Sequence, residues 1–140
     1  MISEEHKAIG RRAWAAYDKG DADAFAACVT PDWREHNGEG HVSTLDDMRG
    51  LMEAQRQAFP DKRTQIVQEL VEGDLLAHRT ITTATHTGRY FDLDPTGRTV
   101  LLHEINIHRI VGARIAETWI AVSQPGGFYK QLSGRDRPSE

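Results

Sequence analysis

The chain has 140 residues, of which 39% are hydrophobic and 27% are charged, and its formal net charge is −4. This length suits one domain, and the composition is that of an ordinary globular protein, which excludes disordered, collagen-like and membrane-spanning chains. The acidic charge argues against nucleic-acid binding, the single cysteine excludes an internal disulfide, and the absence of a long apolar segment or signal peptide predicts a cytoplasmic protein without a membrane partner.

Two helices are predicted at the amino terminus. Ser3 is a suitable N-cap for the first, and apolar residues then recur at helical spacing until Gly20. Asp21 or Asp23 caps a shorter second helix, which ends at Pro31 because proline lacks the backbone N–H that a helix interior requires.

A polar segment separates these two helices from a third. Residues 31–40 contain glycine and few apolar side chains, so we expect a short strand or an irregular loop there. Ser43 or Thr44 caps the third helix, whose apolar residues continue to Phe59 before Pro60 breaks it. The helices are therefore predicted within residues 3–59.

The pattern changes to strands from residue 64 onward, where β-branched residues and alternating polarity become frequent. Within a sheet region of residues 64–123, the predicted strands span residues 64–70, 75–87, 100–111 and 114–122. A closing segment at 126–133 and a frayed tail at 134–140 follow. Helices followed by antiparallel strands predict an α+β fold. We expect a single domain over residues 1–140, a cone-shaped barrel whose curved antiparallel sheet wraps around the N-terminal helices and encloses a pocket.

The last predicted hairpin brings polar side chains together. If Gly112 and Ala113 form a two-residue turn, His108 is opposite Glu117 and side chains alternate between two faces. One face is predicted to carry Glu104, Asn106, His108, Glu117, Trp119 and Ser123. The other is predicted to carry Ile105, Ile107, Ile120 and Val122. The residues leave two alternatives open. The polar face meets solvent in a monomeric sandwich, or it lines a cavity while the aliphatic face meets a second subunit.

Short motifs occur in order between residues 5 and 133. They are Phe59-Pro-Asp61, Thr85-His-Thr-Gly88, Pro95-Thr-Gly97, His108-Arg-Ile110, Ile115-Ala-Glu-Thr-Trp119 and Gln131-Leu132. Together they resemble the SnoaL-like polyketide cyclases, which have the nuclear-transport-factor-2-like fold. The resemblance implies a cofactor-independent enzyme that closes a polyketide ring by intramolecular aldol condensation. It also implies a homodimer or homotetramer assembled through the outer sheet face, and so favours the second alternative for the hairpin.

One position departs from the family pattern. The resemblance implies an acidic residue four positions after Trp119 as general acid or base, but Ser123 stands there, and an unassisted serine is not basic near neutral pH. Three hypotheses follow. Another group, with His108, His36 or Glu104 as candidates, serves as the base. Alternatively, the protein catalyses a related hydroxylation, dehydration, isomerisation or lactone closure, or it is a non-catalytic binding or assembly module.

The catalytic candidates are thus His108, Glu104 and Ser123. Histidine ionises near neutral pH, which suits a proton carrier, although a cross-strand pair of His108 with Glu117 is also a common structural feature. The predicted substrate-binding residues are Trp33, His36, Asn37, His86, Asn106, Glu117 and Trp119. Asn106 is expected to donate to a substrate oxygen, and Trp119 to form an apolar wall. The alternatives are a surface position for His36, a structural role for His86 and a plain core position for Trp119.

Two further classes of protein, metal-dependent proteins and epoxide hydrolases or dehydratases, fit the sequence less well. Seven histidines raise the question of metal binding, but none are spaced as a compact ligand set and no HExxH pattern occurs. We therefore expect neither a metal nor a cofactor. An epoxide hydrolase or dehydratase of the same fold would need a buried aspartate with histidine or arginine, and the sequence offers Arg79 and Glu104 without a suitable aspartate.

Overall fold

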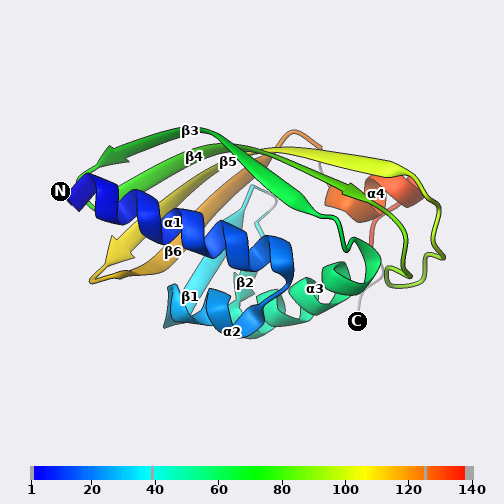
Figure 1. The fold of residues 1–140 in the computed structure, drawn as a ribbon, viewed down its shortest axis with the longest axis horizontal. Coiled ribbons are helices and arrows are strands. Elements are labelled where there is room, and N and C mark those ends of the chain that lie inside the picture. The colour runs from blue at the N-terminus through cyan, green and yellow to red at the C-terminus, as the bar shows by residue number, and fades with distance from the viewer. Residues whose placement is uncertain (1, 39, 125, 138–140) are drawn as a thin grey trace.

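The computed structural model describes residues 2–38, 40–124 and 126–137. In chain order it contains α1 (Ile2–Lys19), α2 (Ala22–Ala27), β1 (Val29–Asn37), β2 (Val42–Thr44), α3 (Leu45–Ala58), β3 (Arg63–Glu72), β4 (Leu75–Thr85), β5 (Thr99–Val111), β6 (Arg114–Val122) and α4 (Gly127–Ser133). The strands form one curved sheet in the order β2-β1-β6-β5-β4-β3, with α1, α2 and α3 on one side of it (Figure 1). The predicted α+β fold is confirmed. No helix among the described residues has both the length and the apolar character needed to cross a bilayer.

Side-chain caps fix the starts of α2 and α3. The Asp21 carboxylate accepts a hydrogen bond from the Ala24 N–H at 3.0 Å. At α3 the Thr44 hydroxyl accepts from the Asp47 N–H, and the Asp47 carboxylate accepts from the Thr44 N–H. This reciprocal capping box satisfies two backbone donors that the helix itself leaves unpaired. Ser3, the predicted cap of the first helix, lies inside α1 instead.

Strand β1 overlaps residues 31–40, where a short strand or an irregular loop was expected, although the sheet itself was predicted only for residues 64–123. It pairs in parallel with β6 and antiparallel with β2, so it extends the sheet beyond the predicted strands. Trp33, Glu35 and Asn37 line the interior, with the two-residue period of a strand. Pro31 and the many polar side chains obscure this period in the sequence, because two of the three inward residues are themselves polar.

A β-bulge changes the register of the β5–β6 hairpin. Its turn forms at Gly112 and Ala113 as predicted, and Gly112 adopts a φ of 62°, which glycine tolerates without a steric penalty. The pairing then shifts between Arg109 and Ile110, which leaves Ala116 as one extra residue on β6. Beyond the bulge, every side chain of β6 lies on the face opposite to the predicted one.

The bulge corrects the predicted assignment of the two faces. His108 pairs with Thr118, not with Glu117, and Asn106 pairs with Ile120, not with Trp119. Residues of β6 and its end that were predicted to line the cavity but do not are Glu117, Trp119 and Ser123. Residues predicted on the outer aliphatic face that instead line the cavity are Ile120 and Val122.

Helix α1 approaches β4 closely because Gly10 has no side chain at the contact. A Cβ at Gly10 would lie 2.6 Å from His78 Cε1 and 2.6 Å from Leu76 Cδ2. The close approach brings the next turn of the helix within reach of the sheet, where the Trp14 indole N–H donates to His78 Nδ1 at 3.2 Å. One wall of the interior is thereby held at a fixed distance from the strands.

The chain after α4 packs against the segment that connects β4 to β5. Arg135 forms an ion pair with Asp92 at 2.8 Å, and the Arg137 guanidinium lies 4.8 Å from the centroid of the Phe91 ring. This part of the predicted frayed tail therefore makes defined contacts. Residues 138–140 lie outside the described residues.

Candidate functional site

A cavity of about 640 Å³ lies between the concave face of the sheet and the helices. This volume is in the range of sites that bind drug-sized molecules. Aromatic and aliphatic side chains make up most of its wall, including Trp14, Phe25, Trp33, Met48, Leu102 and Phe128. The cavity is therefore suited to an apolar ligand with ring systems, and the pocket expected from the sequence is present.

Polar side chains from three adjacent strands interrupt this apolar wall. Glu35 on β1, Thr118 on β6 and His108 on β5 form one row across the sheet, because Glu35 pairs with Thr118 and Thr118 pairs with His108. Asn106 and Glu104 occupy alternate positions on β5 and so share the face of His108. All five residues line the cavity.

Two of these groups are carboxyls that hold their protons more tightly than usual. Burial, followed by repulsion from Glu104, raises the pKa of Glu35 to about 8. Burial also raises the pKa of Glu104, but interactions with Asn106 and Lys62 oppose that rise. The interactions with Asn106 and Lys62 favour the ionised form of Glu104, and ionisation of one carboxyl disfavours ionisation of the other.

A buried lysine lies behind this carboxyl pair. Lys62 Nζ donates to Gln55 Oε1 at 2.7 Å and lies 3.5 Å from the centroid of the Tyr17 ring. The Tyr17 hydroxyl donates to the same Gln55 oxygen at 2.7 Å. Burial lowers the pKa of Lys62 to about 7, against opposing attraction from Asp18 and Glu104. The ammonium is thus held by a cation–π contact and an amide oxygen.

His108 is a neutral imidazole in this site. Burial, followed by repulsion from His78, lowers the pKa of His108 to about 3. Its Nδ1 lies 2.9 Å from the Thr118 hydroxyl, while its Nε2 is buried without a hydrogen-bond partner among the described residues. At neutral pH His108 therefore has one donor and one acceptor nitrogen and carries no charge. The predicted pairing with Glu117, which would have favoured the charged form, is absent.

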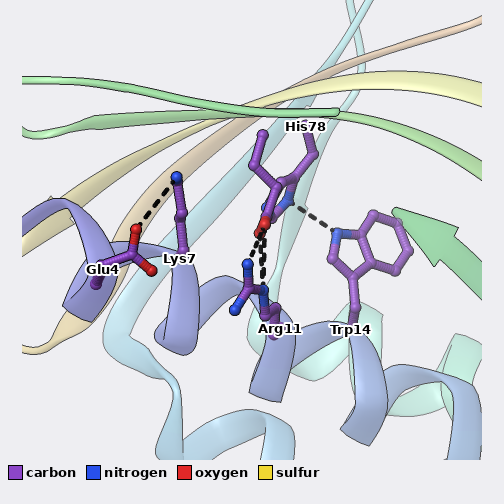
Figure 2. Close-up of polar contacts among 6 residues, drawn as sticks. Glu4, Lys7, Arg11, Trp14 and His78 are labelled. Atoms are coloured by element: carbon purple, nitrogen blue, oxygen red, sulfur yellow. Dashed lines mark hydrogen bonds and ion pairs between the residues drawn. The ribbon is translucent and has the colours of Figure 1, made fainter. Parts of the chain in front are cut away.

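A second histidine supports this wall from behind. Figure 2 shows the Trp14 indole of α1 directed at the ring of His78. The Trp14 N–H donates to His78 Nδ1, so the His78 proton is on Nε2, which lies 3.2 Å from Glu69 Oε2. Arg11 in turn donates from Nε to Glu69 Oε1 at 3.1 Å. The ring of His78 meets that of His108 edge-on, with centroids 5.4 Å apart. The network joins α1, β3 and β4 and fixes the ring that packs on His108.

Comparison with known families identifies the family and the fold. The sequence pattern of the SnoaL-like polyketide cyclases matches residues 7–132. This chain belongs to the SnoaL-like polyketide cyclase family. A comparison with curated proteins found no match.

Several solved structures resemble this SnoaL-like protein. AclR, a proposed hydroxylase from Streptomyces galilaeus, is 27% identical with a TM-score of 0.82, over 99% of this chain and 87% of that chain. IdmH, a proposed polyketide cyclase from Streptomyces antibioticus, is 23% identical with a TM-score of 0.74, over 91% of this chain and 97% of that chain. A proposed polyketide cyclase from Acidithiobacillus ferrooxidans is 21% identical with a TM-score of 0.76, over 96% and 98%. At identities of 23% and 21%, the last two comparisons support a shared fold only.

The structure brings together half of the predicted site residues of this SnoaL-like protein. Those that line the cavity are Trp33, Asn37, Glu104, Asn106 and His108. Glu35, Lys62 and Thr118 were not among the site residues predicted from the sequence. For Gln55, which holds Lys62, a signal was present, because a polar residue on the apolar face of a helix marks a buried hydrogen bond.

Four of the other predicted residues, His36, Glu117, Trp119 and Ser123, lie outside the cavity on the outer side of the sheet. His36 Nε2 lies 2.7 Å from Glu117 Oε2, and the His36 ring stacks on Trp119 with centroids 5.5 Å apart. Arg109 also pairs with Glu117, at 3.2 Å. Ser123 is exposed and donates to Gln124 Oε1 at 2.6 Å. These side chains therefore do not lie where they could contact a ligand inside the cavity.

Two remaining candidates have structural surroundings. His86 is buried, its Nδ1 lies 3.0 Å from the Thr96 hydroxyl, and its ring packs on Phe59. Arg79 is exposed and donates to Gln68 Oε1 at 2.8 Å, so it is not part of a buried acid–arginine pair. Within residues 2–38, 40–124 and 126–137, no three His, Cys, Asp or Glu side chains converge as a candidate metal site.

Proposed function

We propose that this protein is an enzyme that moves a proton next to a carbonyl group of an apolar, polycyclic or polyketide-like molecule, without a cofactor. The observation that carries the proposal is a pair of carboxyls, Glu35 and Glu104, which face one apolar cavity and both have a raised pKa. A general base and a general acid work best when their pKa values lie near the operating pH. Family membership agrees with a small molecule as the ligand.

The two carboxyls have complementary roles in this proposal. Glu104 takes the proton from the carbon next to the carbonyl, and the C–H electron pair forms the C=C bond of an enolate. Glu35, with its pKa of about 8, supplies a proton to the enolate oxygen at neutral pH. Asn106, which lines the cavity, donates to the same oxygen through its side-chain amide. The enol then cyclises or returns its proton at another carbon, which gives cyclisation or isomerisation.

Hydroxylation is a second candidate, which the likeness to AclR, a proposed hydroxylase, favours. Formation of an enolate is the first step there too: its carbon adds dioxygen to give a hydroperoxide, and an external two-electron reductant, such as a thiol, cleaves the O–O bond to give the alcohol and water. A role limited to binding is the main alternative to either reaction. It predicts that a ligand occupies the cavity while no proton is moved.

α-Tetralone tests proton movement without knowledge of the natural substrate. This bicyclic ketone exchanges the protons next to its carbonyl only slowly in neutral deuterated water. Wild-type protein should accelerate deuterium incorporation, measured by NMR, and Glu104→Gln should lower the rate by roughly 100-fold or more. Glu53→Gln, on the exposed surface of α3, is the matched control and should retain the rate. Binding of α-naphthol, a planar mimic of the enol, without any acceleration of exchange would assign the protein to the binding class.

A homodimer formed through the outer sheet face remains part of the proposal. Ile105, Ile107 and Trp119 are 56%, 40% and 39% exposed on that face. Burial of such apolar surface stabilises association. The bulge removes Ile120 and Val122 from the predicted interface, and adds Trp119 with its stacked neighbour His36.

A further inference from the structure

We propose that Thr118 is a positioning residue that holds His108 in the tautomer with its proton on Nε2, so that this N–H donates to the carbonyl oxygen of the ligand. The assignment of the ligand as a carbonyl compound rests on the proposed function. The state of the His108 ring does not, because it follows from hydrogen bonds within the protein.

The Thr118 hydroxyl is the centre of a buried chain of three side chains. The Trp33 indole N–H donates to Thr118 Oγ1 at 3.1 Å, and His108 Nδ1 lies 2.9 Å from the same oxygen. Thr118 is 2% exposed and Trp33 is 1% exposed, so water does not compete for these bonds. The chain joins β1, β6 and β5 at the row that also contains Glu35.

The direction of this chain is fixed by the number of protons available. The Trp33 nitrogen is a donor only, so Thr118 Oγ1 must accept from it. The Thr118 hydroxyl has one proton, and His108 Nδ1 is its acceptor among the described residues. If Nδ1 carried the proton instead, the hydroxyl proton would be buried with no acceptor, which is unfavourable. The favoured arrangement runs from Trp33 through Thr118 to a bare Nδ1, and places the ring proton on Nε2.

Nε2 of His108 is then a donor in need of an acceptor. It is buried without a hydrogen-bond partner among the described residues. Unpaired buried donors are rare in folded proteins and indicate a bound water or ligand. His108 lines the cavity, and the neutral ring of His78 on β4 packs edge-on against it. A carbonyl oxygen of the ligand satisfies this donor.

Nitrogen NMR of the histidine rings tests the tautomer directly. In wild-type protein labelled with ¹⁵N, His108 should show a protonated Nε2 and a bare Nδ1 at neutral pH, with its signals assigned by their loss in His108→Gln. Addition of α-naphthol should shift the Nε2–H signal. Thr118→Ser keeps the hydroxyl and should preserve both results. Thr118→Val removes it and should give a mixture of tautomers, with roughly ten-fold slower exchange of α-tetralone and an unchanged KM.

Several outcomes overturn this assignment. A proton on Nδ1 in the wild type contradicts it, as does equal behaviour of the Val and Ser variants in both tautomer and exchange. If Thr118→Val does not fold, the tautomer of the wild type and its response to α-naphthol still decide the question. A correct tautomer with unimpaired exchange in Glu104→Gln would refute the proposed function alone. Loss of exchange in Glu104→Gln with a proton on Nδ1 would refute the role of Thr118 alone.

Discussion

Glu35 and Glu104 face the same cavity from strands that are not neighbours, since β6 lies between β1 and β5. Among the described residues neither carboxyl has an arginine partner, and burial disfavours the charged form of both. Because the negative charge of one also repels that of the other, the state with a single proton on the pair is favoured over a wide pH range. Such a state contains one acid and one base, which is what proton transfer at a carbonyl compound requires.

The rate of α-tetralone exchange should therefore depend on pH with two limits. It should rise with pH as Glu104 loses its proton, and fall again near pH 8, where Glu35 loses the proton that it supplies to the oxygen. Glu35→Gln cannot ionise, so its exchange should be slower and should not fall above pH 8. Rate measurements from pH 5 to pH 10 check this. A fall near pH 8 that persists in Glu35→Gln would assign the limit to another group.

Glu35 should also reduce the stability of the protein at high pH. Its pKa is raised from 4.5 to about 8 in the folded state, so the folded state binds more protons than the unfolded state between these values. The free energy of unfolding must then fall as the pH rises through this window. Glu35→Gln removes the effect, and should be more stable than wild type at pH 9.

Chemical denaturation at two pH values checks this prediction. At pH 4, where Glu35 is protonated in both states, the two proteins should differ little in the free energy of unfolding. Equal pH dependence in wild type and Glu35→Gln would show that Glu35 is ionised without penalty.

The sequence predicted those parts of the fold that depend on local signals. Asp21 and Thr44 cap their helices as expected, and Gly112 forms the expected turn. The bulge at Ala116 was not predictable, because nothing in its side chain distinguishes it from an ordinary strand residue. This one extra residue places Trp119 on the outer face of the sheet, and Glu117 and Ser123 leave the predicted site for the same reason.

Strand pairing also explains why two residues of the candidate site were not predicted. Glu35 lies in a polar segment in which an inward carboxyl looks like a solvated one, and only the pairing of β1 with β6 places it in the interior. Thr118 lies between Glu117 and Trp119 and was not predicted as a site residue, because the assumed register placed it on the outer face of the sheet. Glu104, Asn106 and His108 were found because alternation along one strand does not depend on the register of its partner.

Lys62 should tune the proton affinity of Glu104. Its attraction lowers the pKa of Glu104, so Lys62→Met should raise that pKa and move the lower limit of the exchange profile to higher pH. Lys130→Met, at an exposed position on α4, is the matched control and should leave the profile unchanged. The measurement is the pH profile of exchange together with the NMR titration of the Glu104 carboxyl. A profile that is the same in both variants would show that the ammonium does not act on Glu104.

The outer face should govern the oligomeric state. Ile107→Asp puts a charge on the exposed apolar surface around Trp119, and should convert the proposed dimer to a monomer because an unpaired charge is costly to bury. Ile2→Asp, at the start of α1 on the other side of the sheet and 66% exposed, is the control and should remain dimeric. Light scattering coupled to size-exclusion chromatography measures both masses. A wild-type protein that is monomeric at all concentrations would refute the proposed interface.

The close contact of α1 with β4 should tolerate no added side chain. In Gly10→Ala the new Cβ would meet His78 Cε1 and Leu76 Cδ2 at 2.6 Å each, so the helix or the strand must move. Overpacking of this kind costs about 1–3 kcal/mol. The displaced helix would also lengthen the bond from Trp14 to His78 and free the ring that packs on His108, which should slow exchange as well. Gly50→Ala, in α3 with no atom within 4 Å of its Cβ, should instead stabilise the protein by roughly 0.5–1 kcal/mol. Thermal unfolding of the two variants beside wild type measures both effects. Equal stability of Gly10→Ala and wild type would show that α1 is not held at this distance from the sheet.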